Sequence, residues 1–417
     1  GRSRKNMVAM HQNTDNTKTF FFRRYPALTL SILTFILIFI LLKISDAILY
    51  QRALRLQGEA QKNEQKQPLW IFGPINRVIR LREQKPMMNG FVKPTQNYLS
   101  ETENLEDKEY YLHTDNDGFI ILPDSLAEAD KIFFIGGSTT ECLFVDEDIR
   151  FPAGVQKRLS EKGLKVKVYN AGVSGNNSLH NLNVLLNKIL PYRPKAVVWM
   201  ECVNDLNVLA YEGSYWNKNI NKSLIMDTAL IRQYNAQFPQ KQTERPEGIL
   251  KNIFPYLSLR YAILKNKFRA KQVPENVDEW AHVGQVSLTE RRDSVKIQFK
   301  NTLKTFIEIC KAWNIQPILM TQQNRLTANP EPKIAAALTA LEKKGINYQD
   351  YHRLYVEMNE IIRQTAKNEN VLLIDLDKEI PKTNEFIYDA VHVNNKGAQL
   401  ATEIITKNLL LHLFKIN

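Results

Sequence analysis

One serine in this chain stands where a nucleophile could act, directly after an apolar run. The run Ile132–Ile135 has the composition of a buried strand, and Gly136 and Gly137 separate it from Ser138. Because glycines allow a sharp turn, the serine side chain would project at the carboxyl end of that strand. A serine hydroxyl attacks a carbonyl carbon once a base has taken its proton. Taken alone, the pattern is more often that of an ordinary turn than that of a catalytic site.

Ser138 also fits the N-cap position of a helix. Thr139 and Thr140 follow it, and Glu141 stands at the capping-box position. A serine at the turn between a strand and a helix can hold both roles. The cap interpretation therefore does not exclude a nucleophile.

Three later segments carry the other groups that this chemistry needs. Gly175 lies in a glycine-rich loop, Asn204 follows an apolar run, and Asp389 precedes His392 by three residues near the carboxyl terminus. A histidine can take the serine proton, and an aspartate can fix the histidine tautomer and stabilise its positive charge. Separately, the asparagine suits an Asx turn and the histidine suits a surface loop. Their joint occurrence favours a catalytic site.

With these four blocks the chain resembles the SGNH (GDSL-like) hydrolase superfamily, in particular its membrane-anchored bacterial envelope members. The resemblance implies that Ser138 is the nucleophile, His392 the general base and acid, and Asp389 the group that orients the imidazole. It also implies an oxyanion hole made by the backbone amides of Ser138 and Gly175 and by the side-chain amide of Asn204. No cofactor is implied.

Two positions depart from the family pattern, and both lie near this site. Gly137 stands where the family usually has an aspartate, and Cys202 stands where it usually has a glycine. Neither position supplies a triad or oxyanion group. The departures nevertheless support an alternative in which the fold serves only binding, as a non-catalytic subunit of a membrane assembly with other membrane-complex partners.

The elements that must position these groups alternate along the chain. Predicted strands alternate with helical patterns, which favours an α/β fold with a doubly wound parallel sheet and helices on both faces. The resemblance implies a flavodoxin-like three-layer sandwich. The predicted strands are 132–135, 166–169, 196–200, 316–320 and 371–375, and the helical patterns are 151–162, 179–190, 294–313 and 351–368.

An uncharged apolar run near the amino terminus predicts one transmembrane helix over residues 26–44. The tail 1–25 is rich in arginine and lysine, so the positive-inside rule places it in the cytoplasm and the rest of the chain outside the cytoplasmic membrane. We expect a single-pass, uncleaved anchor, with a cleaved signal peptide as the alternative. Residues 45–100 are predicted to form a membrane-proximal stem, and 101–417 the hydrolase domain.

An insertion is expected at about 206–290, because the distance between Asn204 and the strand at 316–320 exceeds what one crossover helix needs. Within it, residues 253–269 mix large apolar and basic side chains. They form either a helix that packs on the domain or a lid or interfacial helix that faces anionic lipid. Three aromatic residues of the insertion either stack on a sugar ring or pack in the core: Tyr211, Tyr215 and Trp216.

Composition excludes several other classes of function. The formal net charge is +12, but the basic residues are dispersed and form no recognised nucleic-acid module, so no nucleic acid partner is expected. No histidine shows metal-ligand spacing, so no metal is expected. The three cysteines are too few for a disulfide framework. Cys142 and Cys202 form either two buried thiols or an oxidised pair beside the site.

Together these observations predict a membrane-anchored, extracytoplasmic serine esterase or O-acyltransferase. The expected substrate is an O-acetyl group on envelope or exported polysaccharide, attacked through an acyl-serine intermediate, and this choice rests on the resemblance to anchored envelope members. A lipase or lysophospholipase of the same fold, acting on an acylated lipid, is the alternative within the enzyme class. The triad alone does not distinguish hydrolysis from acyl transfer.

Overall fold

The computed structural model describes residues 25–65, 77–121, 129–237, 253–258, 260–261 and 279–416. The chain divides into two compact units. One is formed from residues 1–74 and 239–272, and the other from residues 75–238 and 273–417. The second unit contains the predicted catalytic residues, and the first contains the predicted membrane helix.

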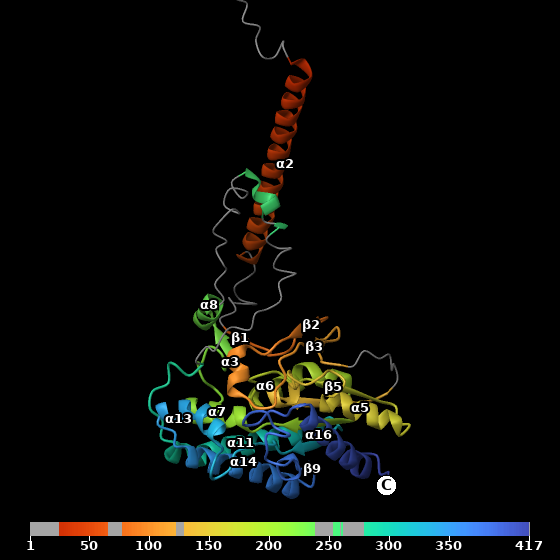
Figure 1. Cartoon of the computed structure of the whole chain (residues 1–417), viewed down its shortest axis with the longest axis vertical. Coiled ribbons are helices and arrows are strands. Elements are labelled where there is room, and N and C mark those ends of the chain that lie inside the picture. The colour runs from red at the N-terminus through yellow and green to blue at the C-terminus, as the bar shows by residue number, and fades with distance from the viewer. Residues whose placement is uncertain are drawn as a thin grey trace, which may run out of the picture. The chain divides into compact units, whose positions relative to one another are not determined.

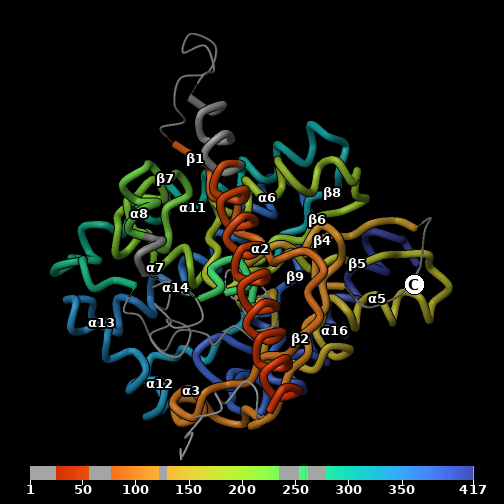
Figure 2. The backbone as a smooth tube through the Cα atoms, turned by 90° about the horizontal axis from the view of Figure 1, so that it is seen from above, coloured from red at the N-terminus to blue at the C-terminus, as the bar shows by residue number. Residues whose placement is uncertain are grey.

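A five-stranded parallel sheet forms the centre of the second unit, with the strand order β5-β4-β6-β8-β9 (Figure 2). Numbered along the chain, this order is that of flavodoxin-like doubly wound folds, and it confirms the predicted fold class. The strand order reverses between β4 and β6, where such folds bind ligands at the carboxyl ends of their strands. The strands are β4 (Asp130–Gly136), β5 (Val166–Asn170), β6 (Ala196–Met200), β8 (Gln316–Met320) and β9 (Leu372–Ile374).

Both faces of this sheet are buried, which explains the continuous apolar runs of its strands. Successive residues of a strand point to opposite faces. Phe133 and Trp199 therefore belong to the hydrophobic core on one side, and Ile132, Phe134 and Val198 to the core on the other.

Helices cover both faces, as the prediction required (Figure 1). Helices supply residues to the core that contains Phe133, and α5 and α16 pack together in the other core. The last turns of the predicted helix at 179–190 are a π-helix and a 3₁₀-helix that follow α6. On the first side lie α6 (Ser178–Val184), α7 (Val203–Glu212), α11 (Leu288–Ala312) and α14 (Tyr348–Glu369), and on the second α5 (Phe151–Glu161) and α16 (Asn395–Asn408).

Two small antiparallel sheets and several short helices complete this unit. Residues 77–100, which were expected in the stem, therefore fold with the second unit. The start of the expected insertion forms part of α7, whose residues belong to the hydrophobic core. The sheets pair β1 (Arg77–Ile79) with β7 (Ile225–Asp227) and β2 (Asn89–Val92) with β3 (Tyr110–His113). The helices are α3 (Gln96–Glu101), α4 (Ser138–Glu141), α8 (Thr228–Gln237), α12 (Pro332–Ala337), α13 (Thr339–Lys343) and α15 (Leu376–Glu379).

The first unit contains one long helix, α2 (Pro26–Gln65), which extends well beyond the predicted span of 26–44. Within Pro26–Arg55 an 18-residue window reaches a mean hydropathy of 2.6, and none of that window is buried. A helix of this length and composition can cross a membrane, and a signal sequence can have the same properties.

Candidate active site

The structure brings the three predicted triad residues into one chain of hydrogen bonds. Ser138 begins α4 directly after strand β4, and its Oγ lies 2.8 Å from His392 Nε2. On the other side of the ring, His392 Nδ1 lies 2.7 Å from Asp389 Oδ2. The arrangement lets the imidazole take the serine proton while the carboxylate stabilises the resulting positive charge.

The loop that carries Asp389 and His392 is fixed by its own hydrogen bonds. The backbone amides of Val391 and His392 donate to Asp389 Oδ1 at 2.9 and 2.8 Å. The Tyr388 amide donates to the His392 carbonyl at 2.8 Å, and the Tyr388 ring stacks on the imidazole with 5.6 Å between centroids. The spacing of three residues therefore lets one short loop hold both groups.

Electrostatics in this loop favour the charged pair. Burial alone would lower the pKa of His392, but the negative charge of Asp389 and its hydrogen bond outweigh burial and raise that pKa above its usual value. Burial would likewise raise the pKa of Asp389, yet the charge and hydrogen bonds of His392 hold it below its usual value. His392 is a base only when neutral, so activity is expected to rise with pH through a midpoint above that of an ordinary histidine.

Tyr98 is a further residue at this site, and no motif in the sequence indicated it. Its hydroxyl donates to Asp389 Oδ2 at 3.2 Å, the same oxygen that faces the imidazole. Its ring packs against Phe144 and Tyr388. Burial raises the pKa of Tyr98 well above 10, so the phenol stays protonated and remains a donor. Tyr98 is thus placed as a positioning residue for Asp389.

Replacing Tyr98 by phenylalanine is expected to move the pH profile of kcat/KM to higher pH. Without the phenol, more of the carboxylate charge acts on His392, which raises its pKa further. Looser positioning of Asp389 is expected to lower kcat by about tenfold, which corresponds to about 1.4 kcal/mol, close to the lower end of what a hydrogen bond to a charged group contributes, about 1.5 to 3 kcal/mol. The measurement is the pH dependence of ester hydrolysis. Tyr111→Phe, at an exposed tyrosine of β3, is the control; a lower kcat with an unmoved pH profile would show a merely structural role.

The predicted oxyanion groups lie beyond the carboxyl ends of strands β4, β5 and β6: Ser138 begins α4, Gly175 is in a loop, and Asn204 is in α7. Gly175 has a φ of +75°, a conformation that favours glycine. The Arg82 guanidinium donates to the carbonyls of Ser174 and Gly175 at 2.9 and 3.2 Å, which fixes this loop. Asn204 lies in the first turn of α7, and its buried side-chain amide interacts with the buried Glu201 carboxyl. A side-chain amide is a donor of the kind that can stabilise an oxyanion.

The position of Asn204 gives a physical reason for the glycine at 137. A Cβ atom on residue 137 would overlap Asn204 Nδ2, and it would also crowd the Asn176 carbonyl at 3.2 Å. The space that a side chain would need at this position is occupied by the asparagine amide. Asn204 can therefore occupy its observed position only if residue 137 is a glycine. An aspartate at 137, as in the family that the sequence resembles, would not fit beside it.

Buried carboxylates hold the loops around the nucleophile. Glu141 accepts hydrogen bonds from the amide and hydroxyl of Ser174 and from Gln84 Nε2. Asp205 accepts from the Ser178 amide at 3.1 Å and from the Tyr215 hydroxyl. These bonds tie α4 to the loop that contains Ser174 and Gly175, and they tie α6 to α7, so these segments keep their relative positions.

The aromatic residues of the insertion separate into two groups. Tyr211 and Tyr215 are buried in the core, which agrees with the packing interpretation, whereas Trp216 is 67% exposed. Only the tryptophan of these three presents its ring to solvent. It alone is available to stack on a sugar.

All three cysteines are free thiols in the described part of the chain. Cys142 belongs to the core that contains Ile132, and Cys202 to the core that contains Phe133, so the sheet lies between them. Burial raises the pKa of Cys142 to about 12 and that of Cys202 well above 9. The alternative of an oxidised Cys142–Cys202 pair is therefore wrong, and both act as small apolar core residues.

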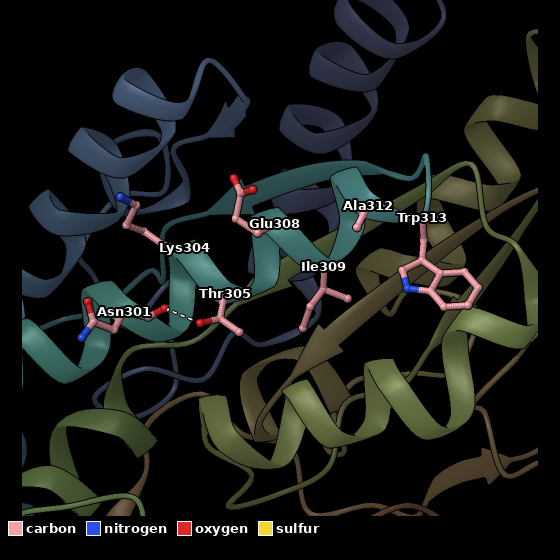
Figure 3. Close-up of a pocket in the computed structure, with 7 residues that line it drawn as sticks. All are labelled: Asn301, Lys304, Thr305, Glu308, Ile309, Ala312 and Trp313. Carbon is pink, nitrogen blue, oxygen red and sulfur yellow. Dashed lines mark hydrogen bonds between the residues drawn. The ribbon is translucent and has the colours of Figure 1, made fainter.

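A hollow on the outer side of α11 provides no competing site (Figure 3). Its residues come from this one helix and the residue that follows it. The Thr305 hydroxyl donates to the Asn301 carbonyl of its own helix at 2.8 Å, so it is paired with no base. The lining residues are Asn301, Lys304, Thr305, Glu308, Ile309, Ala312 and Trp313.

No protein-family model matches this chain, and no curated protein matches it. Several solved structures are similar at low identity. One, from Parabacteroides merdae ATCC 43184, is described as a GDSL-like lipase, with 14% identity, 68% of this chain and 97% of that chain covered, and a TM-score of 0.37. The acetyl xylan esterase AlAXEase has 17% identity, coverages of 66% and 98%, and a TM-score of 0.37.

The lipase/acylhydrolase from Enterococcus faecalis is similar in the same way, with 16% identity, coverages of 67% and 95%, and a TM-score of 0.37. TM-scores this low carry no conclusion about activity. The strand order and the geometry around Ser138 are independent of these comparisons. They agree with the SGNH-like hydrolase fold that the four sequence blocks predict.

Proposed function

We propose that this chain, which has the SGNH-like hydrolase fold, is a serine hydrolase whose nucleophile is Ser138. One observation carries the proposal: Ser138 Oγ, the His392 ring and Asp389 form a continuous hydrogen-bonded chain with separations of 2.8 and 2.7 Å. A module that only binds a partner has no need of this alignment, whereas acyl transfer requires it. The binding-subunit alternative is therefore the weaker one.

The proposed reaction begins when His392 Nε2 takes the Ser138 proton and Oγ attacks the ester carbonyl carbon. The carbonyl oxygen becomes an oxyanion that the backbone amides of Ser138 and Gly175 and the amide of Asn204 stabilise. As the ester C–O bond breaks, the imidazolium gives its proton to the departing alcohol oxygen. Water then attacks the acyl-serine with His392 again as base, and the acid and free enzyme are released. A sugar hydroxyl in place of water would give acyl transfer.

The substrate class we propose is O-acetylated polysaccharide of the cell envelope or of an exported polymer. The resemblance to anchored envelope members of the superfamily supports it, and the exposed Trp216 ring beyond α7 offers a face on which a sugar can stack. A lipase acting on longer acyl chains is the alternative within the class. Acyl length therefore distinguishes the two.

We place the enzyme at the cytoplasmic membrane, with residues 1–25 in the cytoplasm and the catalytic domain outside. The apolar helix α2 and the basic residues before it support this topology. A retained α2 would act as a single-pass anchor.

A fluorophosphonate probe is expected to label the purified full chain and to leave Ser138→Ala unlabelled, because only an activated serine reacts. Ser160→Ala, at an exposed serine of α5, should label like the parent and is the matched control. Hydrolysis of p-nitrophenyl esters is expected to fall from acetate to octanoate. A folded parent chain that neither labels nor hydrolyses any ester would favour the binding subunit, and a preference for octanoate would favour the lipase.

A further inference from the structure

A piece of the insertion packs against the predicted membrane helix, more than two hundred residues away in sequence. We call residues 253–261 the insertion segment, of which 253–258 and 260–261 are described. The ring of Phe254 meets that of Phe39 in α2 edge to face, with 5.5 Å between centroids. Figure 1 shows the segment in green beside the red helix α2. Both belong to the first compact unit.

A buried carboxylate makes this contact specific. Asp46 of α2 is only 4% exposed, and its two oxygens accept the backbone amides of Tyr256 and Leu257, each at 2.9 Å. These amides belong to the turn in which the Ser258 amide donates to the Phe254 carbonyl at 3.0 Å. A carboxylate loses much of its hydration when it is buried, which costs free energy. The two charge-assisted hydrogen bonds to Asp46 offset part of that cost.

The two contacts place the insertion segment at the outer boundary of the predicted span. Phe39 and Asp46 are seven residues apart, so they share one face of α2 and lie roughly 10 Å apart along its axis. Phe39 lies inside the uncharged run 26–42, and Asp46 lies beyond its end. The insertion segment therefore reaches from the hydrocarbon side of this boundary to its polar side.

The outward side chains of the insertion segment suit a membrane interface. Leu257 is 54% exposed and Tyr261 is 57% exposed, and their spacing of four residues suits one helix face. Arg260, also exposed, lies beside them. Tyrosine is favoured at the headgroup level, leucine in the acyl-chain boundary, and arginine near anionic headgroups.

We propose that the insertion segment is a second membrane contact, seated in the outer headgroup region of a lipid bilayer beside α2. Leu257 and Tyr261 enter the acyl-chain boundary, Arg260 contacts anionic headgroups, and Asp46 holds the segment at that depth. The inference rests on the proposed membrane anchorage through α2. In this proposal α2 also holds the insertion segment in place. Cleavage of α2 would end that role, because the segment would lose its contacts with Phe39 and Asp46.

The test uses the full chain in vesicles of phosphatidylcholine and phosphatidylglycerol, with an NBD fluorophore on Leu257→Cys. The native cysteines are buried, and the unsubstituted chain gives the labelling blank. Brominated lipid is expected to lower NBD emission at 257 by about twofold or more, as for a group in the acyl-chain boundary. Ile36→Cys in α2 is the positive control, and Ile297→Cys, at a similarly exposed residue of α11, is the matched comparison.

Quenching at 36 and 257 that clearly exceeds quenching at 297 would support the second contact. If the label at 36 is quenched but the label at 257 is quenched no more than the label at 297, the second membrane contact is overturned, while the proposed anchorage through α2 is supported. Loss of quenching at 36 as well would overturn both. Asp46→Ala should reduce quenching at 257 and spare 36, and unchanged quenching would refute the holding role of Asp46. Ester hydrolysis in the same vesicles reports separately on the proposed chemistry.

Discussion

Replacing His392 by alanine is expected to lower kcat/KM for p-nitrophenyl acetate by about 10⁴-fold or more. The imidazole is 2.8 Å from Ser138 Oγ and is the base positioned to take its proton. Without it the hydroxyl stays protonated at neutral pH and is a poor nucleophile. The measurement is steady-state hydrolysis by the purified variant, with circular dichroism to verify folding.

The two triad substitutions are expected to be strongly non-additive. Once His392 is gone, Ser138 contributes little, so Ser138→Ala with His392→Ala should be only slightly slower than either variant alone. His352→Ala is the control, because that histidine stacks on Tyr348 in α14 and belongs to no catalytic contact described above. If the loss of kcat/KM in the double variant equals the product of the losses in the two single variants, the two residues do not act as one unit.

The sequence was sufficient to predict the sheet and the contact between Asp389 and His392 because both depend on local patterns. A strand buried on both faces must be apolar throughout, so Ile132–Ile135 and the other runs mark the strands directly. The aspartate and histidine lie three residues apart and share one loop. Their hydrogen bond could therefore be expected from spacing, once the fold put that loop beside Ser138.

Contacts between segments that are distant in sequence could not be predicted in this way. Tyr98 bonds to Asp389 across 291 positions, and nothing in its polar surroundings signals burial. Asp46 and the amide of Tyr256 are 210 positions apart, and a backbone donor leaves no mark in a sequence. The place of residues 77–100, which were expected in the stem, could not be predicted for the same reason, since they join the second unit through pairings such as β1 with β7 that are distant in sequence.

The glycine at 137 illustrates a different limit. The sequence shows only that the family aspartate is missing there, which by itself suggests a damaged site. The structure shows Asn204 Nδ2 in the space that any side chain at 137 would enter. One residue's identity thus depends on the position of another that is 67 positions later, and neither residue alone reveals the relation.

Substituting alanine for Gly137 is accordingly expected to cost almost as much activity as removing the Asn204 amide. Asn204→Ala should lower kcat by about 10²- to 10³-fold, the usual effect of losing one oxyanion donor, about 2.7 to 4 kcal/mol. In Gly137→Ala the new methyl group overlaps the place of Asn204 Nδ2, so the amide must move from its present position. Steady-state kcat on p-nitrophenyl acetate measures both effects, with KM expected to change little.

The double variant decides whether the two effects have one cause. If Gly137→Ala acts by displacing the amide, adding it to Asn204→Ala removes the clash and should cost little more than Asn204→Ala alone. A cost that persists in the double variant would place the damage elsewhere, at the Asn176 carbonyl 3.2 Å from the new Cβ. Gly284→Ala is the matched control, because a Cβ there meets no atom within 4 Å. Near-complete non-additivity would make the glycine and the asparagine one functional pair, and would explain how this chain keeps its oxyanion donor without the family aspartate.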